Sequence, residues 1–299
     1  MTRPNHLHVL VFVAILISGH MAAGQNPKAK TKTLEKQLRE EFSQPVEPFR
    51  VIGNIYYVGA MNISSHLIAT SDGLILLDTG TREMFPGLCS NVEKLGFELK
   101  EIKIILSSHA HWDHVEMHAR MKKLTGGRIM AVGQDAAAIT SGKDSSAYGG
   151  AGWEPARVDR TLKDGDTVNL GDVTMQANLT AGHTQGCTTW TMDVEDRGKK
   201  YRVVFVGGTS INDGVILLNN ARHSAIKNDY ARTFRRLNEL QADVFLAQHP
   251  SMYRMDEKRQ QVARGADQNP FIDPDGYQRF VRNEELKFVT QLQQETANR

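Results

Sequence analysis

His109-Ala110-His111-Trp112-Asp113-His114 places three imidazoles and one carboxylate within six residues. The stretch follows Ile102-Lys-Ile-Ile-Leu-Ser107, a short β-branched run that ends at two serines and is typical of a buried strand. Side chains on a loop at a strand end are held by a rigid sheet, where metal sites are commonly built. We therefore interpret residues 109–114 as a metal-ligand loop rather than a polar loop with chance histidines.

The spacing within this loop suggests two metal ions. His109 and His111, two residues apart, can reach one metal from the same side. Asp113 and His114 begin the next turn and suit a second metal nearby. Imidazole nitrogens combined with a carboxylate favour zinc, because calcium and magnesium prefer all-oxygen ligands.

Two further histidines follow predicted strands. Gly182-His183-Thr184 comes after the strand 173–179, and His249-Pro250 comes after the strand 244–247. Of the 11 histidines in the chain, three lie before residue 24, and five of the others occupy these three strand ends. Such a concentration predicts that the three loops converge on one site.

Composition limits the kinds of partner. The 299 residues carry a formal net charge of +2, and their apolar and charged fractions are ordinary for a globular protein. Nucleic acid is not an expected partner, because the sequence has no basic stripe with interleaved aromatic residues. Neither Cys89 nor Cys187 is arranged with a histidine as a nucleophile would be, and we expect two buried free thiols.

The N-terminus has the pattern of a secretory signal peptide. Arg3 precedes an apolar run over 9–18, and small residues follow at 21–24. The run is short for a membrane span, so an uncleaved anchor is the less favoured alternative. We expect a signal peptide over 1–24, export to the periplasm, no membrane attachment after cleavage, and a polar linker to about residue 43. Residues 25–299 would form a single catalytic domain.

Strand and helix patterns occur in both halves of the chain. We predict strands at 66–70, 74–78, 102–107, 128–132, 173–179, 188–194, 201–206 and 244–247, and helices at 84–95, 115–125, 134–140, 230–240 and 277–292. This order predicts an α/β (α+β) sandwich of two sheets covered by helices. The Gly- and Ser-rich stretch 141–153 is expected to be a surface loop with a functional edge.

Taken together, these motifs resemble the metallo-β-lactamase superfamily and, more narrowly, subclass B3 of the metallo-β-lactamases. The resemblance rests on residues 109–114, on Gly182-His183-Thr-Gln-Gly186-Cys-Thr-Thr-Trp190 and on His249, and it extends over essentially the whole mature chain. It implies the αββα fold, in which two mixed β-sheets lie face to face with helices outside.

The resemblance also implies a ligand set for two zinc ions. The first would be held by His109, His111 and His183, and the second by Asp113, His114 and His249. Asp78 matches an aspartate that orients such ligands. Thr209 stands where other superfamily members carry a bridging aspartate or a cysteine ligand, which fits subclass B3.

The implied activity is hydrolysis of the β-lactam ring amide of antibiotics by a hydroxide shared between two zinc ions, which would confer antibiotic resistance. Asp113, Thr209 and Asn212 are the catalytic candidates, with Asp113 also accepting a hydrogen bond from the water and Asn212 contacting the substrate carboxylate. The partner is then a small β-lactam. A monomer is expected, although the sequence leaves the oligomeric state open.

Some residues depart from the family pattern. Glu116 and Met117 replace a small pair and are expected to add bulk beside the second metal, and Ile211 replaces a serine that often contacts substrate. His118 is interpreted as structural rather than as a stray ligand. Two alternatives stay open: another metallo-hydrolase such as an acyl-homoserine lactonase, or a weakly catalytic periplasmic zinc-binding protein. The sequence does not indicate which β-lactam class is preferred.

Overall fold

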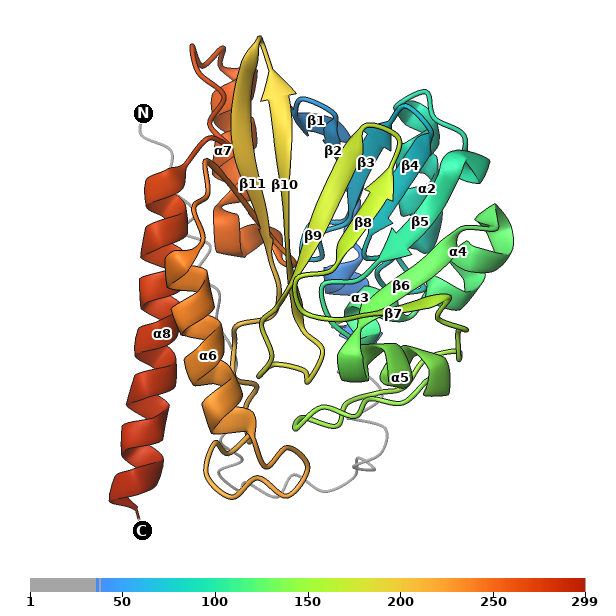
Figure 1. Ribbon diagram of the computed structural model, residues 1–299. Coiled ribbons are helices and arrows are strands. Elements are labelled where there is room, and N and C mark those ends of the chain that lie inside the picture. Colours follow the sequence, from blue (N-terminus) through green and yellow to red (C-terminus); the bar gives the residue numbers. More distant parts are fainter. Residues whose placement is uncertain (1–35, 38, 299) are drawn as a thin grey trace, which may run out of the picture. The chain divides into compact units, whose positions relative to one another are not determined.

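The computed structural model describes residues 36–37 and 39–298 of the chain (Figure 1). The strands and helices below all belong to one unit, Leu38–Arg299. The expected signal peptide over 1–24 lies outside the described residues. Within the described part, none of the helices combines the length and apolar character that crossing a membrane requires.

The first sheet contains seven strands that are neighbours in chain order. They are β1 (Phe49–Ile52), β2 (Ile55–Tyr57), β3 (His66–Thr70), β4 (Gly73–Leu77), β5 (Ile102–Leu106), β6 (Arg128–Val132) and β7 (Arg160–Leu162). β1 to β4 pair antiparallel, whereas β4 to β7 pair parallel. Because parallel strands end at the same edge, the loops after β4, β5 and β6 share that edge.

The second sheet has the order β12-β11-β10-β9-β8. Its strands are β8 (Thr167–Leu170), β9 (Val173–Leu179), β10 (Thr188–Asp196), β11 (Lys199–Val206) and β12 (Val244–Ala247). Only the β11–β12 pair is parallel. Arg197 and Gly198 close the β10–β11 hairpin with φ angles of 52° and 72°, as a two-residue turn with both central residues at positive φ requires.

Alternate residues of β4 enter two different cores. Ile75 and Leu77 belong to the core shared with the second sheet, which includes Trp190 and Val204. Leu74 and Leu76 pack on the other side, in the core formed with α2 (Phe85–Lys94), α4 (His118–Thr125) and α5 (Gly133–Ser141). Both faces of this sheet are therefore covered, which explains why its parallel strands read as continuous apolar runs.

Helices α6 (Ile226–Glu239) and α8 (Pro274–Ala297) cover the second sheet (Figure 1). Tyr230 and Phe234 of α6 pack against Phe288 of α8, and Phe245 of β12 contacts Phe280. The layers therefore run helix, sheet, sheet, helix. This arrangement confirms the predicted αββα sandwich of two mixed sheets.

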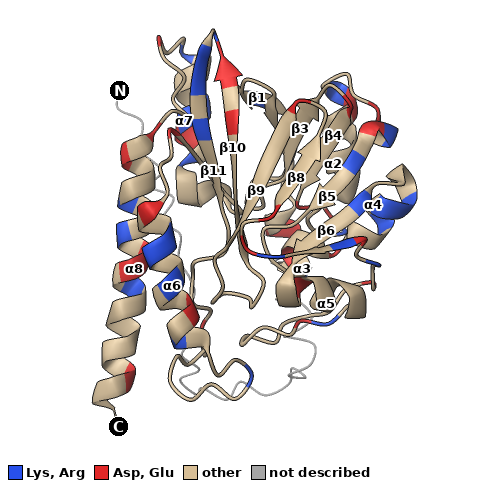
Figure 2. Ribbon diagram, viewed as in Figure 1, with Lys and Arg blue, Asp and Glu red and all other residues tan. Residues whose placement is uncertain are grey.

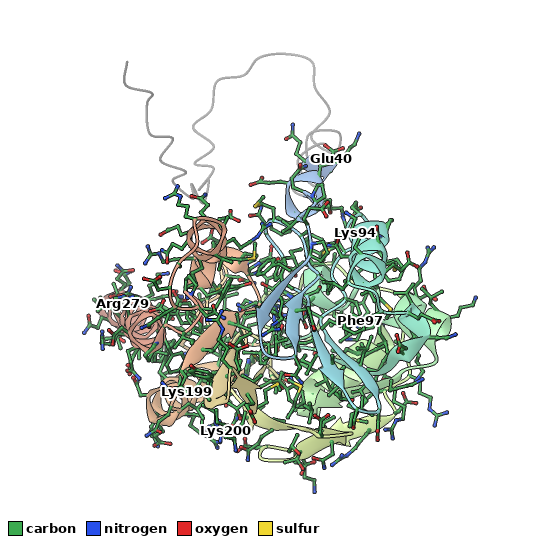
Figure 3. The ribbon with its side chains drawn as sticks, turned by 90° about the horizontal axis from the view of Figure 1, so that it is seen from above. Glu40, Lys94, Phe97, Lys199, Lys200 and Arg279 are labelled. Carbon is green, nitrogen blue, oxygen red and sulfur yellow. The ribbon has the colours of Figure 1, made fainter. Side chains whose placement is uncertain are left out.

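Charged side chains lie mainly on the outer helices and at the far ends of β10 and β11, with both signs interspersed along α6 and α8 (Figure 2). Seen from above, Glu40, Lys94, Lys199, Lys200 and Arg279 extend outward at the periphery (Figure 3). These groups therefore keep their contact with solvent outside the two cores.

Some local predictions were wrong. The single helix expected over 115–125 is broken into α3 (Trp112–Val115) and α4, because Met117 has a non-helical ψ of 11°. The short strands β7 and β8 and the helix α7 (Met255–Ala263) were not predicted. α6 begins one turn earlier than expected, at Ile226.

The polar linker, expected to extend to about residue 43, ends earlier in the structure. Residues 39–42 are helical, and Arg39 and Phe42 pack against Trp112. Both cysteines are free, as predicted, with Cys187 buried and Cys89 only partly so. Burial raises the pKa of the Cys89 thiol to about 11, so it stays protonated and unreactive at neutral pH.

Candidate metal centre

Each predicted ligand lies on a loop just past the end of a strand. Residues 109–114 follow β5, His183 follows β9 and His249 follows β12. The ring centroid of His109 lies 4.2 Å from that of His114, 4.7 Å from that of His111 and 4.6 Å from that of His183. Loops from both sheets therefore meet at one point, as the strand-end pattern predicts.

Two overlapping groups of ligand atoms are present among the described residues. In each group the ligand atoms lie within 4.8 Å of one another: His109, His111 and His183 in one, and His109, Asp113 and His114 in the other. His249 adjoins the second group, with Nε2 3.9 Å from Asp113 Oδ2 and its ring 5.2 Å from that of His114. The structure thus brings together all six residues of the predicted ligand set.

Neighbouring backbone carbonyls fix the tautomers of two histidines. His183 Nδ1 donates to Ser210 O at 2.7 Å, and His249 Nδ1 donates to Asn62 O at 2.7 Å. In each ring the proton therefore sits on Nδ1, which leaves Nε2 as an unprotonated donor for a metal.

Asp78 orients the ligand loop from behind. Its carboxylate accepts hydrogen bonds from Ser108 N at 2.7 Å, Ser108 Oγ at 2.7 Å and His114 Nδ1 at 3.0 Å. Ser108 Oγ in turn lies 3.1 Å from His109 Nδ1. The φ of Asp78 is 63°, an uncommon value for a residue other than glycine, at a position that supports the cluster. Asp78 thus has the orienting contacts that the resemblance implied.

A second buried carboxylate, which sequence reasoning missed, joins the two ligand loops. Asp135 of α5 accepts hydrogen bonds from Ala110 N at 2.8 Å, from Thr184 Oγ1 at 2.6 Å and from Gly186 N at 2.8 Å. Burial raises the pKa of Asp135 to about 6, although these hydrogen bonds oppose the shift. A lone aspartate in a short helix gives no signal in the sequence, because its partners are backbone groups from distant segments.

The loop 141–153 lies against the first ligand group. Ser146 Oγ is 3.1 Å from His111 Nε2, and Arg222 Nε donates to Ser146 O at 3.0 Å. Tyr148, with 51% of its surface exposed, approaches His111 edge-on at 6.2 Å. This contact with a candidate ligand gives the loop the functional edge expected of it.

Burial and charge set the protonation of the cluster. Burial lowers the pKa of His111 to about 4 and that of His183 to about 3, so both are neutral at pH 7. Burial alone would raise the pKa of Asp113, but adjacent His114 holds it well below its usual range. His114 shows the reverse: burial would lower its pKa, and the carboxylates of Asp113 and Asp78 raise it. Metal binding would displace that proton, because a coordinating imidazole must be neutral.

The residues fit a divalent transition metal. His114 Nε2 is buried, lies 3.2 Å from Asp113 Oδ2 and has no hydrogen-bond partner of acceptable geometry. A buried polar atom without a partner is costly, and a bound cation would satisfy it. Neutral imidazoles with one carboxylate are the ligands that zinc-type metals prefer.

A family model of the metallo-β-lactamase superfamily matches residues 58–249, a span of more than half of the chain that holds all six ligand candidates. This chain belongs to the metallo-β-lactamase superfamily. The assignment agrees with the loops and histidines described above and places the chain among metallo-hydrolases.

Solved structures of this superfamily are similar over most of the chain. FEZ-1 metallo-β-lactamase from Legionella gormanii is 35% identical with a TM-score of 0.82, covering 85% of this chain and 98% of that one. BJP-1, a subclass B3 metallo-β-lactamase of Bradyrhizobium japonicum, is 36% identical with a TM-score of 0.81, covering 87% and 98%. These matches confirm the predicted resemblance to subclass B3.

A curated relative from Burkholderia pseudomallei (strain 1710b), named as a probable metallo-hydrolase, is 31% identical over 126 residues. The match covers 41% of this chain and 42% of the relative, so the chain spans less than half of that protein's length.

Other residues predicted for the site have different surroundings. Thr209 is buried, and its hydroxyl donates to Glu284 Oε2 of α8 at 3.2 Å. Asn212 is half-buried in the loop after β11, where its carbonyl accepts from Val215 N. The contact of Thr209 joins the loop after β11 to α8. Catalytic roles for Thr209 and Asn212 stay predictions.

The expectation that Glu116 and Met117 crowd the second metal was wrong. The Glu116 carboxylate is paired with Arg39 and Arg82, and Met117 packs in the core beneath the helices. His118 Nδ1 lies 2.8 Å from Thr79 Oγ1, a contact that supports its structural interpretation. The Glu116 carboxylate therefore takes part in an ion pair and not in the metal centre.

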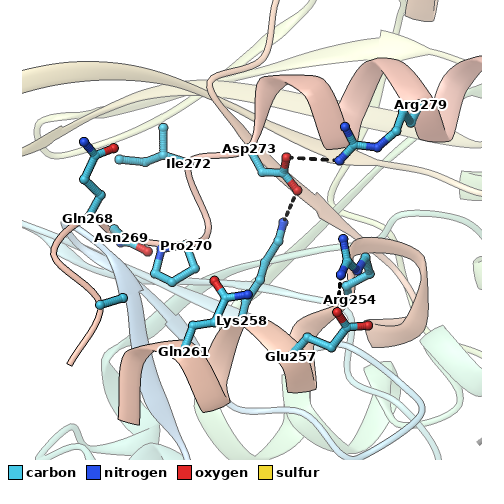
Figure 4. A pocket seen from close by; sticks show the side chains of 11 residues that line it. Arg254, Glu257, Lys258, Gln261, Gln268, Asn269, Pro270, Ile272, Asp273 and Arg279 are labelled. Carbon is cyan, nitrogen blue, oxygen red and sulfur yellow. Dashed lines mark hydrogen bonds and ion pairs between the residues drawn. The ribbon is translucent and has the colours of Figure 1, made fainter. Parts of the chain in front are cut away.

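A separate pocket of about 420 Å³ lies between α7 and the start of α8 (Figure 4). Lys258 pairs with Asp273 at 3.0 Å, Arg279 approaches Asp273 at 3.6 Å, and Arg254 pairs with Glu257. None of the six ligand candidates lines this pocket. The Lys258–Asp273 pair joins α7 to the start of α8, away from the chemistry of the metal centre.

Proposed function

We propose that this protein hydrolyses the β-lactam ring amide of antibiotics, using two zinc ions. The observation that carries the proposal is the second ligand group, which contains Asp113 and His114 and which His249 adjoins. It occurs in a fold that matches FEZ-1 and BJP-1, both metallo-β-lactamases, over 98% of their chains.

His109, His111 and His183 would hold one zinc ion, and Asp113, His114 and His249 the other. Zinc supplies an activated water at neutral pH and polarises the carbonyl that is attacked. The chain itself provides neutral imidazoles in fixed tautomers and a carboxylate that stays ionised. Asp113 can therefore accept a hydrogen bond from the attacking water while remaining a ligand.

The surroundings suit a small substrate. Tyr148 presents an exposed ring beside His111, and Arg222 holds its loop through the backbone of Ser146. Half-buried Ile211 and Asn212 lie on a different loop, after β11. Substrate would bind with its reacting amide over the histidine cluster and its substituents against Tyr148.

A different metallo-hydrolase, such as a lactonase, is the second candidate. The curated relative named as a probable metallo-hydrolase favours it, because that name specifies no β-lactam. A zinc-binding protein with little catalysis is a weaker alternative. One feature that suggested it was the bulk of Glu116 beside the second metal, but the Glu116 side chain lies in an ion pair with Arg39 instead. The substrate assay below distinguishes all three.

The test is hydrolysis of a penicillin, a cephalosporin, a carbapenem and an acyl-homoserine lactone by the purified protein. We expect β-lactam turnover that a chelator abolishes and added zinc restores. His183→Ala should reduce turnover at least about a hundredfold while the circular dichroism spectrum is retained. His66→Phe, which changes a buried histidine outside the cluster, is the matched control and should stay active. Lactone turnover without β-lactam turnover would favour the second candidate, and two bound zinc ions without any turnover the third.

We also propose that the protein acts in the periplasm after removal of residues 1–24. The support is the charged, apolar and small-residue order of that segment. N-terminal sequencing of the protein from a periplasmic extract should begin near Gln25. An unprocessed N-terminus in the cytoplasmic fraction would contradict export.

A further inference from the structure

Glu116 lies two residues after the ligand His114, yet its carboxylate is turned into a buried ion pair. It accepts hydrogen bonds from Arg82 N at 2.9 Å, from Arg82 Nε at 2.9 Å and from Arg39 Nη1 at 3.0 Å. Both Glu116 and Arg39 are buried, at 6% and 8% exposure. A buried carboxylate is stable only when paired, so Glu116 fixes the position of Arg39.

Arg39 belongs to the segment 39–44, which packs against the start of α3. The Arg39 guanidinium lies 4.4 Å from the centre of the Trp112 ring, and Phe42 stacks on the same tryptophan at 6.1 Å with an interplanar angle of 9°. Trp112 directly precedes Asp113, and the four residues of α3 carry both Asp113 and His114. Holding Trp112 therefore limits the movement of the two ligands that follow it.

The same segment reaches His249 from the other side. The ring of Phe42 lies 6.4 Å from that of His249. Asn62, whose carbonyl accepts from His249 Nδ1, donates from its side chain to Glu41 O at 3.2 Å. Met61 N donates to Gln44 O at 2.9 Å. The loop that orients His249 is thus hydrogen-bonded to the segment that Glu116 anchors.

His249 is the ligand candidate that most needs such support. Its side chain is 26% exposed, compared with 0% for His114 and 12% for Asp113. The ligands of the first group are held instead by Ser108, Ser146 and Ser210, none of which belongs to segment 39–44. Anchoring of this segment should therefore affect the two metal sites unequally.

We propose that Glu116 is a positioning residue for the second metal site: through Arg39 it holds segment 39–44 against Trp112 and His249. The inference rests on the two-metal centre of the proposed function and is independent of the substrate. A residue that touches no metal thus sets the affinity of one site by ordering the chain segment beside it.

The test is zinc binding by the metal-free protein in competition with a chromophoric chelator, which resolves two dissociation constants. In Glu116→Gln the second constant should rise at least about tenfold, as for other groups that support a ligand, while the first stays within about twofold. Phe42→Ala changes only a half-buried side chain at the end of the same path, and it should weaken the second site in the same direction. It serves as the second variant if Glu116→Gln folds poorly.

Glu83→Gln is the matched control. Glu83 also contacts Arg39, at 3.2 Å, but its side chain is 30% exposed and it does not contact Trp112 or His249 through any described interaction. Exposed ion pairs contribute little, so both constants should be unchanged. In a Co²⁺-loaded protein, Glu116→Gln should alter only the absorption that develops with the second equivalent.

The outcomes separate this inference from the proposed function. If wild type binds two zinc ions and Glu116→Gln and Phe42→Ala leave both constants unchanged, or weaken both equally, the inference is overturned and the two-metal centre stands. If wild type binds fewer than two zinc ions, the proposed function fails as well. Selective loss of the second site in both variants supports the inference.

Discussion

Gly208 shows how one residue without a side chain allows the cluster to form. A Cβ built on Gly208 would lie 2.2 Å from Cδ2 and 2.5 Å from Cγ of the His183 ring. Carbon atoms of separate groups cannot approach this closely, so the backbone of the loop after β11 can pass His183 only if residue 208 is glycine. Glycine is therefore needed at position 208 because of the nearby His183 ring, and not because of the turn itself.

We expect Gly208→Ala to displace the His183 ring and to weaken the first metal site. Zinc affinity at that site should fall about tenfold or more, measured by chelator competition, and turnover should fall with it. Gly87→Ala is the control, since a Cβ there meets nothing within 4 Å. Equal zinc affinities in the two variants would show that the His183 ring can move aside without loss.

Asp78 shows the opposite arrangement, a residue that keeps its side chain in an unfavourable backbone conformation. Its φ of 63° would suit glycine, but glycine could not accept the hydrogen bonds from Ser108 and His114. The sequence motif around Asp78 identified this residue as a candidate, and its tertiary contacts explain why it is an aspartate.

At the scale of elements, the short helix α5 connects two ligand loops through Asp135. The carboxylate receives two backbone N–H groups and one hydroxyl, and the residue is 2% exposed. An asparagine has only one acceptor oxygen, so at least one of these donors would lose its partner.

We expect Asp135→Asn to lower the free energy of unfolding by about 1–3 kcal/mol, the cost of a buried donor without a partner. Urea denaturation at pH 7.5 measures the change. Asp172→Asn is the control, because Asp172 is exposed and accepts a single backbone N–H from Ser71. A loss no larger than that of Asp172→Asn would mean that water replaces the missing contact.

At the scale of the whole molecule, His66 lies where the two sheets meet. Its ring packs edge-on against Tyr57 of the first sheet at 5.6 Å and against Phe205 of the second at 5.3 Å. His66 Nε2 is buried and has no hydrogen-bond partner. Burial lowers the pKa of His66 from 6.5 to about 4, although the charge of Asp78 partly opposes the shift.

This shift links stability to pH. Between pH 6.5 and about 4 the unfolded chain binds a proton at residue 66 that the folded chain does not, so stability falls as the pH is lowered through this range. The full loss attributable to His66 is about 3 kcal/mol. In His66→Phe this part of the dependence should disappear. Urea denaturation of both metal-free proteins at pH 7 and pH 4.5 gives the comparison, in which the other histidines cancel. Identical pH dependence in the two proteins would contradict the expectation.

The sequence by itself determined the αββα class and the candidate ligands. Continuous apolar runs mark parallel strands buried on both faces, and histidines directly after such strands report where the loops converge. These signals are local, because they depend on a residue's place relative to its own strand. Boundaries were predicted less well: the helix expected over 115–125 is interrupted at Met117, whose ψ of 11° is not helical.

Only the tertiary structure decided which groups hold the ligands in place. Asp135, Ser146, Asn62 and Arg39 leave no periodic signal, because each acts on a segment far away in the chain through a few hydrogen bonds or ring contacts. The same is true of Glu116. The family pattern placed its side chain beside the second metal, whereas in the folded chain it pairs with Arg39 and Arg82. A pattern along the chain can specify which atoms are able to bind a metal. Their orientation depends on contacts between distant segments, which exist only once the two sheets have packed together.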